Sequence, residues 1–148
     1  MPPSEVLFVC TFNGVRSPMA AGLMRLFYGD AIRVDSCGLQ PCEEVDPLAA
    51  VVMAEIGVDL SGHEPRRLRD MLGQRRFGSV VALSAEAWRE VQSADGVAQS
   101  WNWPTPDPTG GDGSREARLE AYRLTRRDLE VRIIAAFGPP QHVLASHG

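Results

Sequence analysis

Residues 5–19 read EVLFVCTFNGVRSPM and contain, in order, the signals for a strand, a tight loop and a helix. The opening apolar run is short enough for a buried parallel strand. Asn13 and Gly14 tolerate the positive φ angles that a tight loop requires. Pro18 suits the first turn of a helix, and Ser17 is able to cap that turn. The stretch therefore predicts a strand, a loop and a helix that follow one another directly.

Two side chains with reactive chemistry lie at the ends of this loop. Cys10 and Arg16 are separated by five residues. The backbone N–H groups of such a loop converge at the positive end of the helix, which makes a binding site for an anion. A guanidinium fork suits two oxygens of a tetrahedral oxyanion, and the same positive field stabilises a thiolate. Besides capping the helix, Ser17 could donate its hydroxyl to the Cys10 sulfur. We interpret Cys10 as a nucleophile and Arg16 as an oxyanion clamp; the alternative is a buried structural cysteine beside a surface arginine.

The rest of the chain alternates strand signals with helix signals, without internal repeats. Strands are expected at residues 5–9, 32–36, 80–83 and 97–101, and helices at residues 17–28, 47–56, 65–73, 85–92 and 114–137. This order predicts an α/β fold in which about four parallel strands form a sheet with helices on both faces. We expect a single three-layer domain over residues 1–148, in which residues 139–148 form a flexible tail.

The topology directs one distant carboxylate toward the loop. Ligands of open parallel sheets bind outside the carboxyl ends of the strands. Cys10 stands at the end of the first strand, and Asp107 follows the end of the last one, within the sequence WPTPDP at residues 103–108. Asp107 is therefore the candidate general acid. An Asp-Pro pair in a stretch rich in proline and glycine is also typical of a plain turn, which is the alternative role of this residue.

Composition excludes several classes of function. With 148 residues, of which 44% are hydrophobic and 23% charged, the chain is typical of a soluble globular protein with a sizeable core. Its formal net charge of −4 disfavours nucleic acid as a partner. No apolar run approaches the ~18 residues of a membrane span, and the first residues lack the pattern of a signal peptide. Together with three cysteines, an odd number, these features predict a cytoplasmic protein without membrane or nucleic-acid partners.

The loop and three later segments resemble a known family in the family's own order. The loop is similar to the active-site loop of the low-molecular-weight protein tyrosine phosphatases, whose fold is shared by thioredoxin-coupled arsenate reductases. The later segments are VDSCGL at residues 34–39, GVDLSGH at residues 57–63 and the WPTPDP stretch. The resemblance spans roughly residues 5–137, nearly the whole chain. It implies the three-layer fold of that phosphatase family.

The resemblance also implies hydrolysis of phosphomonoesters through a cysteinyl-phosphate intermediate, without a cofactor. In that reaction the thiolate of Cys10 attacks phosphorus, Arg16 and the loop hold the oxygens, and Asp107 protonates the leaving oxygen and later activates water. The loop residues implied to bind phosphate are Thr11, Phe12, Asn13, Gly14, Val15 and Ser17. The implied substrates are a phosphorylated protein, with phosphotyrosine as the expected residue, or a small aryl phosphate. Inorganic phosphate or sulfate is expected to bind in the loop.

Outside the loop, the resemblance implies a supporting network. Asn13 in left-handed geometry is held there by hydrogen bonds from Ser36 and His63. A histidine in a Ser-Gly-His turn is about equally often a local hydrogen-bonding residue, and under either interpretation we expect His63 to be structural and not an acid or base. No metal is expected, because Cys37, Cys42 and His63 lack the paired spacing that is typical of zinc ligands.

The chain departs from the family at two places. Many members carry a second cysteine in the loop that protects the nucleophile as a disulfide, and here that position is Val15. In the family the Asp-Pro pair is followed by aromatic residues that flank a phosphotyrosine ring, whereas Asp107 is followed by Pro-Thr-Gly-Gly. Phe12, Trp101 or Trp103 could replace that platform, although packing in a core or a loop is the more common role of such residues.

Two other functions stay open. An arsenate reductase of this fold relays a disulfide from its nucleophile to two later cysteines, which would fall at residues 83–93, and this chain has no thiol there. Cys37 and Cys42 could substitute only in a different geometry. The other alternative is a non-catalytic module that binds phosphate or sulfate, but binding alone requires no nucleophile such as Cys10. The residues therefore favour a phosphatase.

Overall fold

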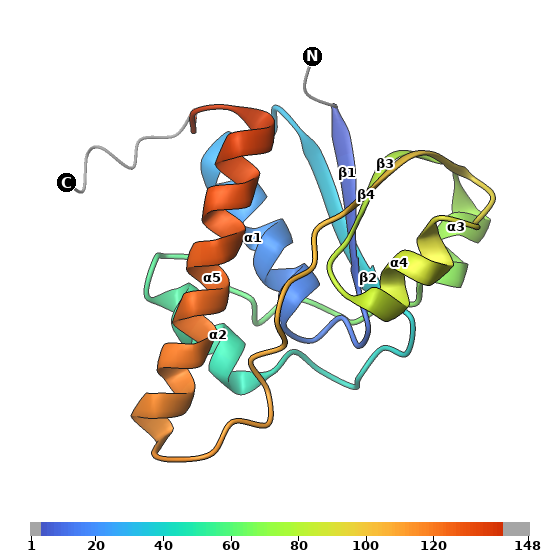
Figure 1. The fold of residues 1–148 in the computed structure, drawn as a ribbon. Coiled ribbons are helices and arrows are strands. Elements are labelled where there is room, and N and C mark those ends of the chain that lie inside the picture. The colour runs from blue at the N-terminus through green and yellow to red at the C-terminus, as the bar shows by residue number, and fades with distance from the viewer. Residues whose placement is uncertain (1–3, 141–148) are drawn as a thin grey trace.

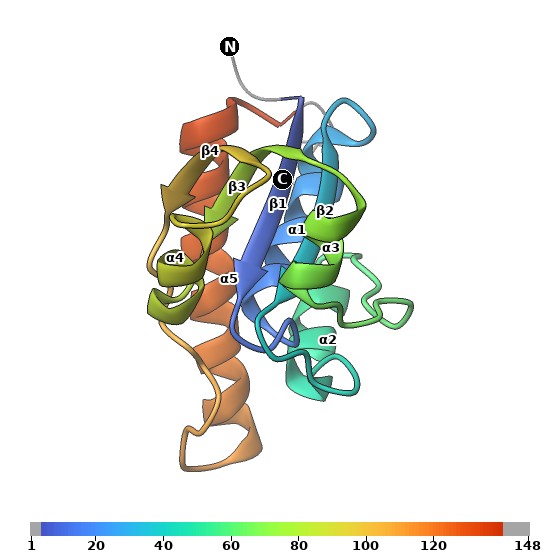
Figure 2. The same cartoon turned by 90° about the vertical axis from the view of Figure 1, so that its right-hand side faces the viewer.

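A four-stranded parallel sheet forms the centre of the molecule. The computed structural model describes residues 4–140. The strands are β1 (Glu5–Cys10), β2 (Arg33–Gly38), β3 (Phe77–Ala82) and β4 (Val97–Asn102), and they lie in the order β2-β1-β3-β4. Cys10 at the end of β1 is paired with Gly38 at the end of β2. Figure 2 shows these two neighbouring strands pointing the same way, so that both end at the same edge of the sheet.

Helices cover both faces of the sheet, which confirms the predicted three-layer α/β fold. The helices in the described part of the chain are α1 (Arg16–Tyr28), α2 (Pro47–Ala54), α3 (Leu68–Gln74), α4 (Ala85–Val91) and α5 (Arg115–Phe137). Figure 1 shows α1, α2 and α5 on one side of the strands and α3 and α4 on the other. None of the helices within residues 4–140 is both long enough and apolar enough to cross a membrane.

β1 is buried on both faces because its side chains alternate between two hydrophobic clusters. Val6 and Phe8 pack with α1, α2 and α5, whereas Leu7 and Val9 pack with α3 and α4. All four side chains are at most 2% exposed. A strand that is apolar at every position suits this double burial. The carboxyl end of β1, where Cys10 lies, is therefore held by packing from both sides.

The structure confirms one helix cap that the sequence predicts and contradicts another. Asp46 caps α2, because its Oδ1 accepts the Leu48 N–H at 2.8 Å, as the Asp-Pro pair predicts. Of the two roles predicted for Ser17, capping of α1 is wrong, whereas the contact with the Cys10 sulfur is present. That helix has Val15 at its N-cap and no side-chain cap. The amide N–H groups of its first turn are therefore left for a ligand.

Two element boundaries differ from the predicted ones by about three residues. β3 begins at Phe77, not residue 80, because Phe77 and Ser79 already pair with β4. α3 begins at Leu68, because Arg66 and Arg67 are held extended beside the end of β2, where the Gly38 N–H donates to the Arg66 carbonyl at 2.8 Å. Most of the predicted tail at residues 139–148 lies outside the described residues.

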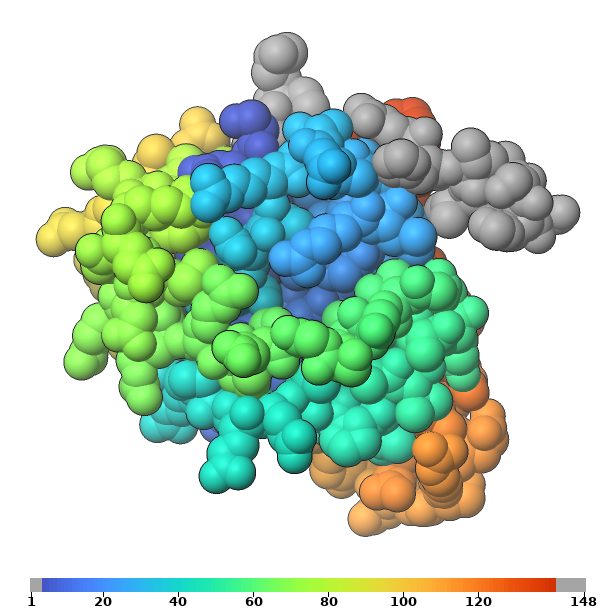
Figure 3. Space-filling model, turned by 180° about the vertical axis from the view of Figure 1, so that it is seen from behind, coloured from blue at the N-terminus to red at the C-terminus, as the bar shows by residue number. Residues whose placement is uncertain are grey.

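Figure 3 shows the back of the molecule, where the segment around residues 55–65 lies as a green band across the surface. This segment follows the end of α2 and contains no helix or strand. It includes His63, whose ring reaches the loop after β1. The band therefore acts as a strap that brings a remote side chain to the edge of the sheet at which Cys10 lies.

Candidate active site

The loop after β1 curls back so that its own groups surround the Cys10 sulfur. The backbone N–H of Asn13 donates to Cys10 Sγ at 3.3 Å, and the hydroxyl oxygen of Ser17 lies 2.9 Å from the same sulfur. Asn13 makes the turn possible by adopting a φ of 54°, and it is the one non-glycine residue of positive φ within residues 4–140. A negative charge on the sulfur is stabilised by both of these donors.

The side chain of Asn13 fixes this strained turn from inside. Its Nδ2 donates to Ser17 Oγ at 2.8 Å and to Ser36 Oγ at 3.0 Å, and its Oδ1 accepts the Arg66 N–H at 2.9 Å. Asn13 is fully buried, so each of these bonds satisfies a group that has no access to water. Three separate segments of the chain thus meet at one amide.

Ser17 links the sulfur to the end of β2. Its hydroxyl is within reach of two acceptors, Cys10 Sγ at 2.9 Å and the Cys37 carbonyl at 3.2 Å, but it carries only one hydrogen. With a neutral thiol, Cys10 donates to Ser17 and Ser17 donates to the carbonyl. With a thiolate, the hydroxyl hydrogen turns to the sulfur. Ser17 is therefore placed to follow the ionisation of Cys10.

His63 supports the loop from the strap. Its Nε2 lies 3.1 Å from the carbonyl oxygen of Asn13, and since a carbonyl only accepts, Nε2 carries the hydrogen. Burial lowers the pKa of His63 below its usual 6.5, although the bond to Asn13 acts in the opposite direction. The ring is thus neutral at pH 7, and its position fits the expected structural role.

Gly38 allows the loop to approach the sheet closely. A Cβ atom at this position would lie 2.7 Å from the Asn13 nitrogen and 2.9 Å from the Phe12 carbonyl carbon. Both of those are backbone atoms that cannot move without deforming the loop. The position therefore requires a residue without a side chain, a requirement that the sequence alone did not reveal.

Arg16 and Asp107 meet beside the loop, as the topology predicted. Arg16 Nη1 donates to the Thr105 carbonyl at 2.9 Å, and Nη2 lies 3.9 Å from Asp107 Oδ2. The other oxygen of Asp107, Oδ1, accepts from both the N–H and the hydroxyl of Thr109. Arg16 is largely buried, whereas the Asp107 side chain is 41% exposed. One carboxylate oxygen is thus fixed in a turn and the other faces the arginine.

A pocket of about 340 Å³ opens above Cys10. Its wall includes loop residues, the segment between β2 and α2, and the segment after β4; the lining residues are Cys10, Phe12, Gly14, Val15, Arg16, Cys42, Glu44, Val45, Asp46, Pro47, Asp107 and Thr109. Residues 44–47 were not expected from the sequence to be part of the site. Their position between the end of a parallel strand and the next helix was the available signal.

Of the three aromatic residues considered as a substrate platform, Phe12 is the one that lines this pocket. Phe12 is 49% exposed. Trp103 instead packs in the core, with its ring centroid 6.0 Å from that of Phe8 and 6.4 Å from that of Phe137. Trp101 is 37% exposed on β4, away from the pocket lining. Trp103 thus packs in the core, as such residues commonly do, whereas Phe12 is available to contact a substrate.

Thr11 does not point into the pocket. Its hydroxyl is directed to the start of α4, where it lies 3.1 Å from both Ser84 Oγ and Glu86 Oε2. This contact ties the loop to the opposite layer of helices. Both residues that Thr11 contacts lie within residues 83–93, where the relay cysteines of the resembling reductases would fall. Any contribution of Thr11 to phosphate binding therefore comes from its backbone.

The two remaining cysteines have different surroundings. Cys37 is fully buried in β2 among Leu7 and Val9, and burial strongly raises the pKa of its thiol. Cys42 is half-buried and lines the pocket, and its pKa is also raised, mainly by burial. No group of three or more His, Cys, Asp or Glu side chains among residues 4–140 is arranged to hold a metal ion.

These groups define a class of protein: one that holds a cysteine at the centre of a tight loop, with an arginine and a carboxylate beside it, at the carboxyl edge of a parallel sheet. Residues 5–136 match the family described as low molecular weight phosphotyrosine protein phosphatase. The chain therefore belongs to this family of cysteine-dependent enzymes, as its loop sequence indicated.

Relatives within the family carry two kinds of name. A glutaredoxin arsenate reductase of Synechocystis sp. is 43% identical over 135 residues, which cover 87% of this chain and 92% of the relative. The crystal structure of an arsenate reductase from Archaeoglobus fulgidus is similar with a TM-score of 0.69 and 27% identity, over 86% of this chain and 94% of the other. A low molecular weight protein tyrosine phosphatase from T. tengcongensis is similar with a TM-score of 0.68 and 27% identity, over 87% and 94% of the two chains.

Proposed function

We propose that the protein is a phosphatase that hydrolyses phosphomonoesters through a cysteinyl-phosphate intermediate on Cys10. The observation that carries this proposal is the position of the Cys10 sulfur. It lies within hydrogen-bonding distance of two donors, the Asn13 N–H and the Ser17 hydroxyl, and it lines the pocket that also contains Arg16 and Asp107. A nucleophile, a cation and a carboxyl group thus share one pocket, as phosphoryl transfer to a thiolate requires.

The first step forms a bond between Cys10 and phosphorus. The thiolate attacks in line with the leaving oxygen, and the sulfur–phosphorus bond forms as the phosphorus–oxygen bond breaks. The free N–H groups at the start of α1 and the guanidinium of Arg16 hold the equatorial oxygens, on which negative charge accumulates. Arg16 is already positioned by the Thr105 carbonyl, so little reorganisation is needed.

Asp107 serves both halves of the reaction. In the first half it donates a proton to the leaving oxygen. In the second half it accepts a proton from the water that attacks phosphorus, and the sulfur–phosphorus bond breaks to release inorganic phosphate. Thr109 holds one oxygen of Asp107 through two hydrogen bonds, which leaves the other oxygen to exchange protons with the substrate.

Phe12 favours an aryl phosphate as the substrate. Its ring is half exposed at the mouth of the pocket, with Val45 and Pro47 also on the wall. A flat ring placed over Cys10 would be in contact with apolar surface. Phosphotyrosine of a protein, or a small aryl phosphate, fits this chemistry better than an alkyl phosphate.

The experiment is a steady-state assay with aryl phosphates of good and poor leaving groups. Cys10→Ser should lose essentially all turnover while still binding inorganic phosphate, and Arg16→Ala should lose roughly 3 to 4 kcal/mol of transition-state stabilisation. Asp107→Asn should lower turnover by ~10²- to 10⁴-fold for the poor leaving group and less for the good one, which needs no proton. Equal losses for both substrates would refute the acid assignment.

The matched test of substrate class uses Phe12. Phe12→Leu keeps an apolar side chain but removes the ring. We expect kcat/KM to fall by ~5- to 10-fold for an aryl phosphate and to stay near the parent value for an alkyl phosphate. A uniform change across both substrates would contradict recognition by the ring.

Arsenate reduction is the second candidate, favoured by the names of relatives such as the Synechocystis protein. Such a reaction needs a second thiol that displaces arsenic from Cys10. The region expected to hold relay thiols contains Ser84 and Glu86 instead, bound to Thr11. We therefore expect no arsenate-dependent NADPH oxidation through a relay of two later cysteines, with thioredoxin or glutaredoxin and their reductants; Cys42, the other thiol that lines the pocket, is the cysteine through which any such reduction would have to pass. Robust oxidation that is lost on replacing both Cys37 and Cys42 by Ser would favour the reductase.

A non-catalytic oxyanion-binding module is tested by the same assay. Such a module would bind phosphate but show no turnover with any phosphomonoester, and Cys10→Ser would change nothing. Saturable hydrolysis that depends on Cys10 would exclude it.

A further inference from the structure

We propose that Cys42 is the resolving thiol of Cys10, which captures an oxidised Cys10 sulfur as a reversible disulfide. The proposal rests on the reactive Cys10 of the proposed function but not on any particular phosphate substrate. It assigns a role to a cysteine on the wall of the pocket that phosphate hydrolysis does not use. The oxidant is hydrogen peroxide or another hydroperoxide.

The first observation is that both thiols line one pocket. Of the three cysteines, Cys10 and Cys42 border the pocket of about 340 Å³ and Cys37 does not. The two thiols therefore border one shared, open space.

The second observation is a close approach between Cys42 and the loop. The backbone N–H of Cys42 donates to the Phe12 carbonyl at 3.0 Å, so its main chain is attached directly to the loop. Its sulfur lies so close to Gly14 that a Cβ atom there would be only 2.7 Å from Sγ. The absence of a side chain at Gly14 is what admits the thiol to this position.

The third observation is that Cys42 can leave its resting position at little cost. Within residues 4–140 its thiol donates one hydrogen bond, to the carbonyl of Glu44 at 3.1 Å, two residues along the same segment. The segment between β2 and α2 contains no helix or strand. Thiol hydrogen bonds are weak, so a turn of this side chain toward Cys10 loses little.

Cys37 does not border the pocket, and it lies within a strand. It is fully buried in β2 and packs with Leu7 and Val9, on the face of the sheet that is opposite to Val6 and Phe8. Burial strongly raises the pKa of its thiol. Cys37 therefore serves as the internal control for the proposal.

The chemistry balances with a peroxide as the oxidant. The Cys10 thiolate attacks one peroxide oxygen, the O–O bond breaks, and hydroxide leaves a sulfenic acid on Cys10. The Cys42 thiol loses its proton and attacks the Cys10 sulfur. The S–S bond forms, the S–O bond breaks, and the second oxygen leaves as hydroxide, which the released proton converts to water. Two thiols are oxidised as one peroxide is reduced, and an external dithiol reverses the step by exchange.

The disulfide has a protective consequence. A sulfenic acid that finds no thiol is oxidised further to sulfinic acid, which a dithiol does not reduce. Capture by Cys42 stops Cys10 at a reversible stage.

The test treats the reduced full chain with a small excess of hydrogen peroxide and maps its peptides without reduction. We expect a Cys10–Cys42 disulfide in the parent and in Cys37→Ser. In Cys42→Ser we expect no such disulfide, and trapping of Cys10 sulfenic acid by dimedone. Recovery of aryl phosphate hydrolysis after dithiothreitol, relative to each protein's own starting rate, should be at least ~5-fold lower in Cys42→Ser than in the parent.

Two results would overturn the proposal: a parent map without the Cys10–Cys42 peptide, or a Cys42→Ser protein that recovers as fully as the parent. If Cys42→Ser fails to fold, the parent map alone decides. Because the map does not depend on activity, a disulfide without hydrolysis would refute only the phosphatase, and hydrolysis without a disulfide would refute only the role of Cys42.

Discussion

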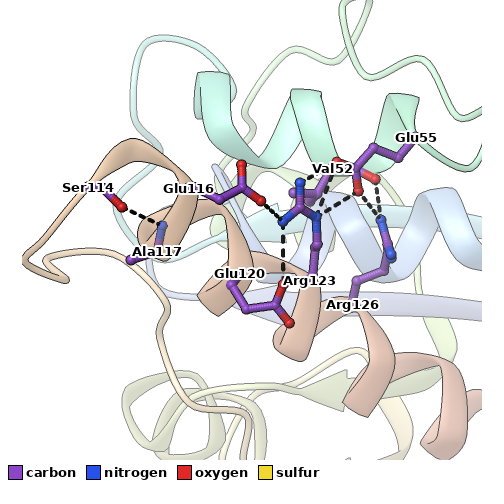
Figure 4. A network of polar contacts seen from close by, with 8 residues as sticks. All are labelled: Val52, Glu55, Ser114, Glu116, Ala117, Glu120, Arg123 and Arg126. Atoms are coloured by element: carbon purple, nitrogen blue, oxygen red, sulfur yellow. Dashed lines mark hydrogen bonds and ion pairs between the residues drawn. The ribbon is translucent and has the colours of Figure 1, made fainter.

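Two polar networks join distant parts of the chain, and they differ in their exposure to water. The loop network, which consists of Asn13, Ser17, Ser36, His63 and the backbone of Arg66, surrounds a fully buried amide. The helix ion-pair cluster joins α2 to α5 at the surface and consists of Glu55, Glu116, Glu120, Arg123 and Arg126 (Figure 4). The first contains mostly neutral groups and the second only charged ones.

The comparison teaches that bond number and charge are poor guides to importance. Arg123 alone makes ion pairs with three carboxylates, yet the side chain of Glu116 is 75% exposed and that of Glu120 is 52% exposed. Water and salt screen such pairs, so each contributes little. In the loop network, by contrast, removing one partner leaves a buried polar group without any bond, which is costly.

The largest effect is expected from Asn13→Ala. The change leaves the Ser36 hydroxyl and the Arg66 N–H without their partner and places alanine at a φ of 54°. We expect the free energy of unfolding to fall by about 3 to 5 kcal/mol and turnover to fall by at least ~10²-fold, measured by urea unfolding and aryl phosphate hydrolysis.

Asn13→Gly is the matched control. Glycine accepts the positive φ but makes none of the side-chain bonds, so it should recover only about 1 kcal/mol of the loss. If both variants unfold like the parent, the loop network does not hold the site.

A smaller effect is expected from Gly38→Ala, which places a methyl group against the backbone of Asn13 and Phe12. We expect a loss of about 1 to 3 kcal/mol in unfolding free energy and ~10-fold in turnover. Gly62→Ala is the control, since nothing lies within 4 Å of the added carbon, and it should stay within about 0.5 kcal/mol of the parent. Equal behaviour of the two variants would show that close approach of loop and sheet is not required.

The smallest effect is expected from Glu55→Gln in the helix ion-pair cluster. Hydrogen bonds from Arg123, followed by those from Arg126, hold the pKa of Glu55 at about 2, below the ordinary 4.5. Because the unfolded chain takes up its proton at the higher pH, the stabilisation is complete above about pH 4.5 and is lost as the pH falls toward about 2.

Because Glu55 is exposed, we expect Glu55→Gln to lower the free energy of unfolding by less than about 1 kcal/mol at pH 7 and by still less in high salt. Turnover should not change. Thermal unfolding of parent and variant across that pH range is the measurement, with Glu120→Gln as a weaker companion because Glu120 makes one contact, at 3.3 Å. A loss that salt does not diminish would contradict the comparison of the two networks.

Features set by local signals and by topology could be predicted from the sequence. The apolar run before Cys10, the Asp46-Pro47 pair and the alternation of strands with helices indicated the sheet, α2 and the layers. The meeting of Arg16 with Asp107 followed from one rule, that parallel strands end at one edge.

Features set by three-dimensional contact could not be predicted. The contact between Ser17 and the Cys10 sulfur was one of two roles expected for this hydroxyl, but its second acceptor, the Cys37 carbonyl, is supplied only by the folded chain. The need for glycine at position 38 and the approach of Cys42 to Gly14 depend on backbone distances between separate segments. Propensity carries no information about such distances.

The burial of α1 has a consequence for which parts of the site open to solvent while the chain stays folded. Most of its residues are buried, including those of the first turn, where Arg16 and Ser17 lie, so the helix cannot open without exposing the core. The hydrogen-bonded amide hydrogens of α1 beyond its first turn should therefore exchange with solvent only through global unfolding, whereas the exposed turn that holds Asp107 should exchange through local opening. Cys10 then keeps its position as long as the chain is folded. The turn that holds Asp107, by contrast, can open and close many times within the lifetime of one folded molecule.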